Sequence, residues 1–128
     1  MVTRRTFLAG ATTALSLGLS GCMYHMSEED SDYIATYNFQ QSKPRMHIRF
    51  VNKPSDTDLD SMAIEHDDRG IWDTTELHPD LTRQSVEYPR DQTPEEIEEH
   101  KLVLYDTHDN MLEEHYLVLP ERMRNPRR

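Results

Sequence analysis

Apolar and polar residues alternate one by one in several short segments of this chain, and this period of two constrains its fold more than any other feature. The clearest segment places Met46, Ile48 and Phe50 on one side of an extended chain. His47 and Arg49 fall on the other side. Alternation of this kind predicts a β-strand with one buried face and one solvated face.

Seven segments are candidates for strands, and the turn-forming residues 107–110 predict that the last two form a hairpin. Seven short strands in a domain of about 100 residues favour a small antiparallel β-sandwich of immunoglobulin-like type. A small β-barrel is the alternative architecture for the same strands. We therefore expect an all-β fold whose strands cover residues 33–39, 46–51, 59–65, 71–76, 83–88, 101–106 and 111–119.

A helix start signal interrupts the strand pattern once. Thr93 is followed by Pro94 and, at the third helical position, by Glu96, which is the arrangement of a capping box. Ile97 is the only apolar residue among the next few positions. The sequence therefore predicts one short surface helix near residues 94–100.

The inward-facing residues of the strands predict a modest core. A domain of this size buries roughly two-thirds of its unfolded surface, which leaves little room for a deep catalytic cavity. The expected core consists of Phe39, Ile48, Phe50, Met62, Ile64, Trp72, Val86, Leu102, Leu104, Tyr116 and Val118.

The first 22 residues have a different character from the rest of the chain. Arg4 and Arg5 precede an apolar run from Phe7 to Leu19, and Cys22, the only cysteine, follows this run. At 13 residues the run is shorter than the roughly 20 residues that cross a bilayer. A basic head, a short apolar middle and a small-residue exit are typical of a secretory signal peptide.

This segment resembles two family signals, the twin-arginine export motif and the lipoprotein signal-peptidase box, which here reads Leu19-Ser-Gly-Cys22. The resemblance implies export, a lipid anchor on Cys22 and a location at the outer face of the cytoplasmic membrane. We expect a signal peptide over 1–21, a lipidated cysteine with an acidic tether over 22–32, a β domain over 33–120 and a basic tail over 121–128.

Acidic residues dominate the chain after the signal segment. The full chain has 24 Asp and Glu against 14 Lys and Arg, and only three of the basic residues are lysines. Acidic surplus with few lysines resembles the proteins of extreme halophiles of haloarchaeal type, in which carboxylates keep the surface hydrated. Recognition of cations or basic partners is the alternative. Nucleic-acid binding is disfavoured because it requires clustered basic charge, which only the C-terminal tail offers.

Few residues favour chemistry. Gly70 is the one glycine after residue 21, and no serine is framed by glycines, so phosphate loops and nucleophile elbows are disfavoured. Asp56, Asp58 and Asp60 have the spacing that begins a calcium loop, but the rest of that loop is absent and the spacing can arise by chance. The histidines at positions 66, 78 and 108 are weak zinc candidates without a ligand spacing, and exposed polar residues are the alternative.

Trp72, the only tryptophan, follows the one glycine turn of the domain. A loop there could present it as a contact residue, since tryptophan is enriched at interface hot spots. Burial in the core is the alternative. The expectation is a lipid-anchored cell-surface protein whose domain serves binding or assembly, with no enzymatic activity and no cofactor. An accessory subunit of a membrane or redox complex is the first alternative, and a metal-binding enzyme is the second.

Overall fold

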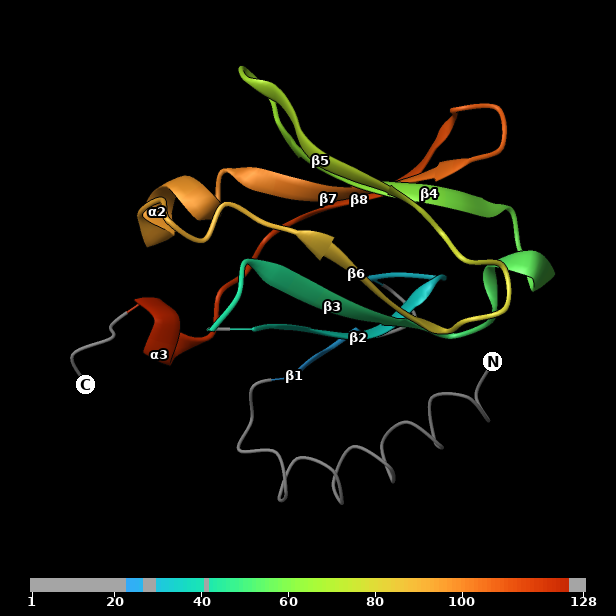
Figure 1. The fold of residues 1–128 in the computed structure, drawn as a ribbon, viewed down its shortest axis with the longest axis horizontal. Helices are drawn as coiled ribbons and strands as arrows, with labels where there is room; N and C mark the ends of the chain where they lie inside the picture. The colour runs from blue at the N-terminus through green and yellow to red at the C-terminus, as the bar shows by residue number, and fades with distance from the viewer. Residues whose placement is uncertain (1–22, 27–29, 41, 125–128) are drawn as a thin grey trace.

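The computed structural model describes residues 23–26, 30–40 and 42–124, and within them two four-stranded antiparallel sheets pack face to face (Figure 1). Sheet A has the order β1-β2-β3-β6 and sheet B the order β5-β4-β7-β8. The strands of sheet A are β1 (Met23–His25), β2 (Ile34–Phe39), β3 (Arg45–Phe50) and β6 (Arg83–Glu87). Those of sheet B are β4 (Leu59–His66), β5 (Gly70–Glu76), β7 (His100–Asp106) and β8 (Met111–Tyr116).

The strand order is that of an immunoglobulin-like sandwich. When β2 to β8 are taken as the seven strands of such a domain, the second strand pairs with the fifth within sheet A, and the third pairs with the sixth within sheet B. The fourth strand, β5, joins the sheet of the third, and β1 adds an edge strand beside β2. The sandwich prediction is confirmed, and the sheets do not close into the alternative barrel.

All seven predicted strands are present within a few residues of the expected bounds, because each follows a local alternation of side chains. The hairpin is also confirmed: Asp106 accepts the backbone N–H groups of His108 and Asn110 at 2.8 and 2.9 Å. These bonds hold the pKa of Asp106 below its usual value, with the Asn110 N–H contributing most.

The core lies between the sheets, and eight of the eleven predicted core residues belong to it. The prediction was wrong for three: Trp72, Tyr116 and Val118 are exposed by 46%, 52% and 38%. Two β-bulges explain the errors, because an extra residue reverses which side chains face inward. The core also contains residues that were not expected, among them Ile34, Met46, Leu59, Tyr88, Ile97, Leu117 and Leu119.

One bulge lies in β5, where Ile64 of β4 pairs with Asp73 and Glu65 pairs with Ile71, so that Trp72 is the extra residue. The other lies in β8, where Leu104 pairs with Glu113 and Tyr105 with Met111. From Glu113 onward the inward positions are odd-numbered, and Leu117 and Leu119 enter the core instead of Tyr116 and Val118.

Glu113 therefore faces inward at the edge of sheet B, where it joins β8 to the segment before β2. Its carboxylate accepts the hydroxyl of Ser31 at 2.6 Å and the backbone N–H of Asp32 at 2.8 Å. It also lies 2.9 Å from Nε2 of His115. Burial opposes ionisation of Glu113, but these three bonds outweigh it and lower the pKa of the carboxyl. Inward-pointing charge is one way in which proteins protect an edge strand from pairing with other chains.

The helices α2 (Pro94–Ile97) and α3 (Glu121–Arg124) lie at one end of the sandwich (Figure 1). α2 (Pro94–Ile97) has the predicted capping box: Glu96 N–H donates to the Thr93 hydroxyl, and Thr93 N–H donates to the Glu96 carboxylate. Ile97 anchors it in the core. No helix in the described ranges combines the length and apolar composition needed to cross a bilayer.

Two elements of the structure lie outside the expected β domain of residues 33–120. β1 lies inside residues 22–32, where it pairs with β2, and Met26 beyond it is buried. Three residues are too few to show an alternating pattern, so the strand had no sequence signal. In the expected tail, α3 (Glu121–Arg124) forms a helical turn, and Met123 packs against the core.

Candidate functional site

The turn between β4 and β5 presents the most conspicuous apolar side chains of the described surface. Gly70 closes the turn with a φ of 83°, a conformation that other residues adopt at a cost. Ile71 and the bulged Trp72 follow directly and are exposed by 63% and 46%. The bulge re-aims the tryptophan away from the position that regular alternation would give it.

Other exposed apolar residues lie at the same end of sheet B. Ile71 pairs with Glu65, Glu65 with Lys101 and Lys101 with Tyr116, so that these four residues form one row across the outer face. Val118 comes two residues later and is also exposed. Four of the six exposed large apolar side chains in the described residues thus belong to this region, which we name the apolar end: Ile71, Trp72, Tyr116 and Val118.

His66, the last residue of β4, holds the turn between β4 and β5 through its side chain. Its Nδ1 accepts the backbone N–H groups of Asp68 and Arg69 at 3.0 and 3.2 Å. Because Nδ1 serves as an acceptor, the ring proton is assigned to Nε2, which lies 3.3 Å from the Glu99 carboxylate. Both ring nitrogens are therefore engaged in holding the turn.

His100 supports Trp72 through ring contacts. It is 1% exposed, and its Nδ1 lies 2.9 Å from the carbonyl oxygen of Glu96, which can only accept, so the proton is assigned to Nδ1. Its ring lies edge-on to His66 at 4.9 Å between centroids and edge-on to Trp72 at 6.3 Å. Edge-to-face stacking holds one side of the indole in place while the other remains open to solvent.

A second group of contacts holds the turn to the outer face of sheet B. Asp67 receives a bond from the Tyr116 hydroxyl at 2.9 Å and an ion pair from Lys101 at 2.9 Å. Lys101 also contacts Glu114 at 2.8 Å. The bond from Lys101, followed by that from Tyr116, lowers the pKa of Asp67, and the two carboxylates raise the pKa of Lys101.

Beside this group, the Tyr105 hydroxyl donates to Glu65. Burial and then this bond raise the pKa of Tyr105 to about 12.

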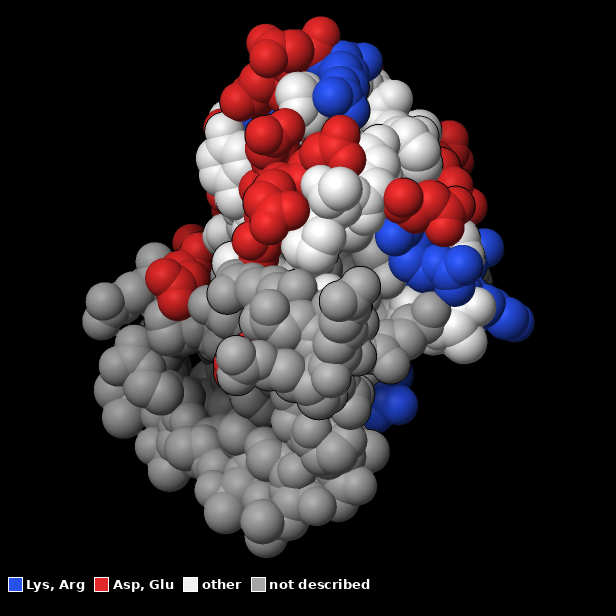
Figure 2. All heavy atoms as spheres, turned by 90° about the vertical axis from the view of Figure 1, so that its left-hand side faces the viewer, with Lys and Arg blue, Asp and Glu red and all other residues white. Residues whose placement is uncertain are grey.

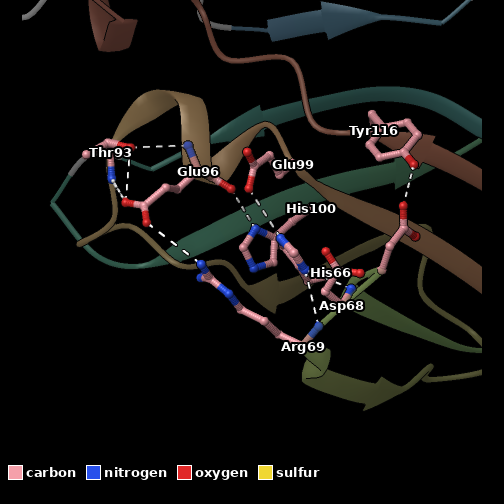
Figure 3. A network of polar contacts seen from close by, with 9 residues as sticks. His66, Asp68, Arg69, Thr93, Glu96, Glu99, His100 and Tyr116 are labelled. Atoms are coloured by element: carbon pink, nitrogen blue, oxygen red, sulfur yellow. Dashed lines mark hydrogen bonds and ion pairs between the residues drawn. The ribbon is translucent and has the colours of Figure 1, made fainter.

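On the opposite side the turn is joined to α2 (Figure 3). The Arg69 guanidinium lies 4.0 Å from the Glu96 carboxylate, which the capping box already orients through Thr93. The Thr93 N–H and hydroxyl lower the pKa of Glu96 and keep it ionised. With contacts to α2 on one side and to β7 and β8 on the other, the turn is held as a rigid platform for Ile71 and Trp72.

The polar side chains of this region are engaged in contacts with one another. Both ring nitrogens of His66 are occupied by the contacts that hold the turn. Lys101 lies between Asp67 and Glu114, and Arg69 lies beside Glu96. Exposed aromatic side chains on a rigid support, surrounded by polar groups that already have hydrogen-bond partners, are typical of interaction surfaces.

Within the described residues, the predicted metal ligands do not come together. Asp56 ends the 3-10 turn η1 (Pro54–Asp56), and Asp58 and Asp60 flank the start of β4. The described residues contain no group of three His, Cys, Asp or Glu side chains arranged to hold a metal, so these aspartates do not converge. Arg4, Arg5 and Cys22 lie outside the described residues. Trp72, predicted as either contact or core, is exposed and lies in the apolar end.

Sequence reasoning missed most of the site. His66, Glu99 and His100 come together through the pairing of β4 with β7, which joins residues more than 30 positions apart. The Asp67–Lys101–Glu114 group depends on the register of three strands. The sequence signals within the site were Gly70 followed by Ile71 and Trp72, and His66, which was named only as a weak zinc candidate.

Comparison of the chain with protein-family models, with curated proteins and with solved structures found no match.

Proposed function

We propose that this chain is an exported lipoprotein, held at the outer face of the membrane by lipid on Cys22, whose sandwich domain recognises another macromolecule through the apolar end. The domain acts by binding and performs no enzymatic reaction. The support comes from two different parts of the chain: the signal segment for the anchor, and the exposed Trp72 on its rigid platform for the recognition surface.

The exposure of Trp72 is the observation that carries the recognition proposal. An indole that was needed only for stability would be buried between the sheets, but this one is 46% exposed beside exposed Ile71. Its supporting histidine is already ordered, so little side-chain entropy is lost when a partner covers the ring. Preorganised aromatic residues of this kind supply a large part of interface binding energy.

Trp72→Ala tests the recognition surface against a structural role. We expect a change in unfolding free energy of about 1 kcal/mol or less, because the ring is half exposed, and loss of partners that copurify after gentle extraction in high salt. Leu81→Ala is the matched control, since Leu81 is 51% exposed but lies in the loop between β5 and β6. Cooperative unfolding lost in Trp72→Ala, or copurification equal in both variants, would refute the proposal.

Cys22→Ser tests the anchor separately. The wild-type chain is expected in the membrane fraction, with the mass of its N-terminal peptide increased by lipid, and the variant is expected to lose both properties. An unmodified Cys22 peptide from wild-type membranes would contradict the anchor whatever the outcome for Trp72.

A stable subunit of a larger membrane complex is a second candidate, favoured by the row of residues that crosses the outer face of sheet B. Ile71 and Tyr116 lie at the two ends of this row, so a flat partner could contact both. A fixed stoichiometry of the copurified partner, retained through size-exclusion chromatography, would favour the subunit. Exchangeable binding would favour a free receptor.

The acidic composition leads us to propose adaptation to high salt as part of this function. Screening by molar salt, which shortens the Debye length to about 3 Å, reduces repulsion between like charges. We expect the melting temperature of the full chain to rise from dilute buffer to molar salt. Equal melting temperatures in both conditions would reject the halophilic interpretation.

A further inference from the structure

The outer face of sheet A is basic although the chain as a whole is acidic. Met46, Ile48 and Phe50 of β3 face the core, so Arg45, His47 and Arg49 face outward. On the neighbouring β6 the outward positions are Arg83, Ser85 and Glu87. Three of the eleven arginines of the chain are therefore gathered on two strands, with one carboxylate among them. We name Arg45, Arg49 and Arg83 the arginine face.

Glu87 lies opposite Arg45 in the strand register, but it does not form a close ion pair with it in the described structure. Within the described ranges no ion pair joins any of the three to a carboxylate, although the chain has 24 acidic residues. Arg45 donates to the Ser85 hydroxyl at 3.2 Å, and Arg49 lies directly opposite Arg83 in the strand register. Like charges in opposed positions destabilise a sheet, so the arrangement does not serve stability.

The arginine face belongs to the same sheet as the start of the described domain. Met23 pairs with Asn38, and Asn38 pairs with His47 between Arg45 and Arg49. Cys22 directly precedes Met23, so a lipid on Cys22 would enter the bilayer beside this sheet. In Figure 2, which looks at the end carrying α2, carboxylates cover much of the upper part of the described surface, with one group of basic side chains among them, and further arginine and lysine side chains lie lower on the right.

We propose that the outer face of sheet A docks on the membrane, with the arginine face bound to anionic lipid head groups. This inference rests on the proposed lipid anchor and adds an orientation to it. The guanidinium group binds phosphate through two parallel hydrogen bonds, which direct contact preserves even where salt screens longer-range attraction. Sheet B lies about 10 Å farther from the bilayer, and its outer face, with Ile71 and Tyr116, points away from the membrane toward a partner.

The orientation is tested with a matched pair of labelled variants. Glu87→Cys and Glu76→Cys make the same change at exposed outward positions, one in β6 of sheet A and one in β5 of sheet B. In the mature lipoprotein Cys22 is occupied, so a thiol-reactive fluorophore reports only the new position. Each full-length variant is reconstituted into phosphatidylcholine vesicles with or without phosphatidylglycerol, and a nitroxide on the lipid head group serves as the quencher.

We expect the label at position 87 to be quenched at least several-fold more than that at position 76 in phosphatidylglycerol vesicles, and the difference to shrink in pure phosphatidylcholine. Arg49→Gln with Arg83→Gln should abolish the difference without lowering the melting temperature. Lys53→Gln, which removes a cation from the loop after β3, is the control and should leave the difference unchanged.

Failure of the orientation and failure of the anchor are distinguishable. Equal quenching at both positions in a chain that floats with phosphatidylcholine vesicles overturns the docking face and leaves the anchor intact. A chain that does not float with phosphatidylcholine contradicts the anchor. Phosphatidylglycerol-dependent binding with selective quenching at position 87 would then still support the face, and no binding to either vesicle would overturn it.

Discussion

The outer faces of the two sheets are built on the same alternation of side chains, yet they differ in whether their charged side chains form ion pairs. On sheet B, Lys101 lies between Asp67 and Glu114. On sheet A, Arg49 faces Arg83 across the strand pair, and neither has a carboxylate within ion-pair distance in the described structure. On sheet B the charged side chains contact each other and hold the turn between β4 and β5 in place. On sheet A the guanidinium groups of Arg49 and Arg83 are available to bind an anion. We infer that the charges of sheet B hold the turn that presents the apolar end, whereas the charges of the arginine face are available to an anionic ligand.

Glu113→Ala should have the largest effect, because it removes the charge that joins sheet B to the segment before β2. The substitution leaves the Ser31 hydroxyl, the Asp32 N–H and His115 without their acceptor. Loss of buried charge-assisted bonds predicts a decrease in unfolding free energy of about 2 to 3 kcal/mol, measured by urea denaturation. Glu113→Gln, which keeps the shape, should lose less. A decrease below about 0.5 kcal/mol for Glu113→Ala would show that this edge is held by other contacts.

Acid should weaken the same contact in the wild-type chain. The folded-state pKa of Glu113 is below its ordinary value of 4.5, so its contribution is complete above that value and is lost as the pH falls through the lowered folded pKa. Thermal unfolding from pH 6 to pH 3 should therefore show a steeper loss of stability in the wild type than in Glu113→Gln. Parallel pH profiles would exclude Glu113 as a source of acid sensitivity.

Lys101→Met should lower the melting temperature by less than Glu113→Ala. The variant keeps the aliphatic stem but leaves Asp67 and Glu114 facing each other without a cation. Lys53→Met is the control for the change in net charge, since Lys53 is exposed and outside this group. If both lysine variants melt at the same temperature, the charge group on sheet B has no special role and the contrast between the faces weakens.

Arg83→Gln should have the smallest effect and the opposite sign. Removing one of two opposed arginines is expected to raise the unfolding free energy by about 0.2 to 1 kcal/mol at low salt, measured by urea denaturation with Lys53→Gln as reference. A loss of stability relative to that reference would assign a structural role to Arg83. The arginine face would then no longer contrast with sheet B.

The sequence was sufficient for β2 to β8 and the capped helix because their signals are local. Alternation in residues 46–51 and the sequence from Thr93 to Glu96 each specify a conformation without reference to the rest of the chain. A bulge has no such signal, since it depends on the partner strand. Trp72, Tyr116 and Val118 were consequently assigned to the core by a period of two that the pairing interrupts.

The candidate site was harder to predict from the sequence than the strands, because its contacts join strands that are distant in the chain. Trp72 was identified from the adjacent glycine turn, but its support by His100 required the pairing of β4 with β7. The arginine face was equally hard to predict from the sequence. Arg49 and Arg83 are 34 positions apart, and only the register of β3 with β6 brings them opposite each other.

The pairing of β1 bears on the order of events during maturation. A peptidase that cuts before Cys22 needs the flanking residues as an extended, unpaired chain in its active site, but Met23 is the first residue of a strand. If the domain is exported already folded, β1 must peel from β2 before cutting and re-form afterwards. Three residues at a sheet edge are a small cooperative unit that opens locally at low cost. Under the proposed lipid anchor, the shortness of β1 would allow cleavage before Cys22 without unfolding of the sandwich.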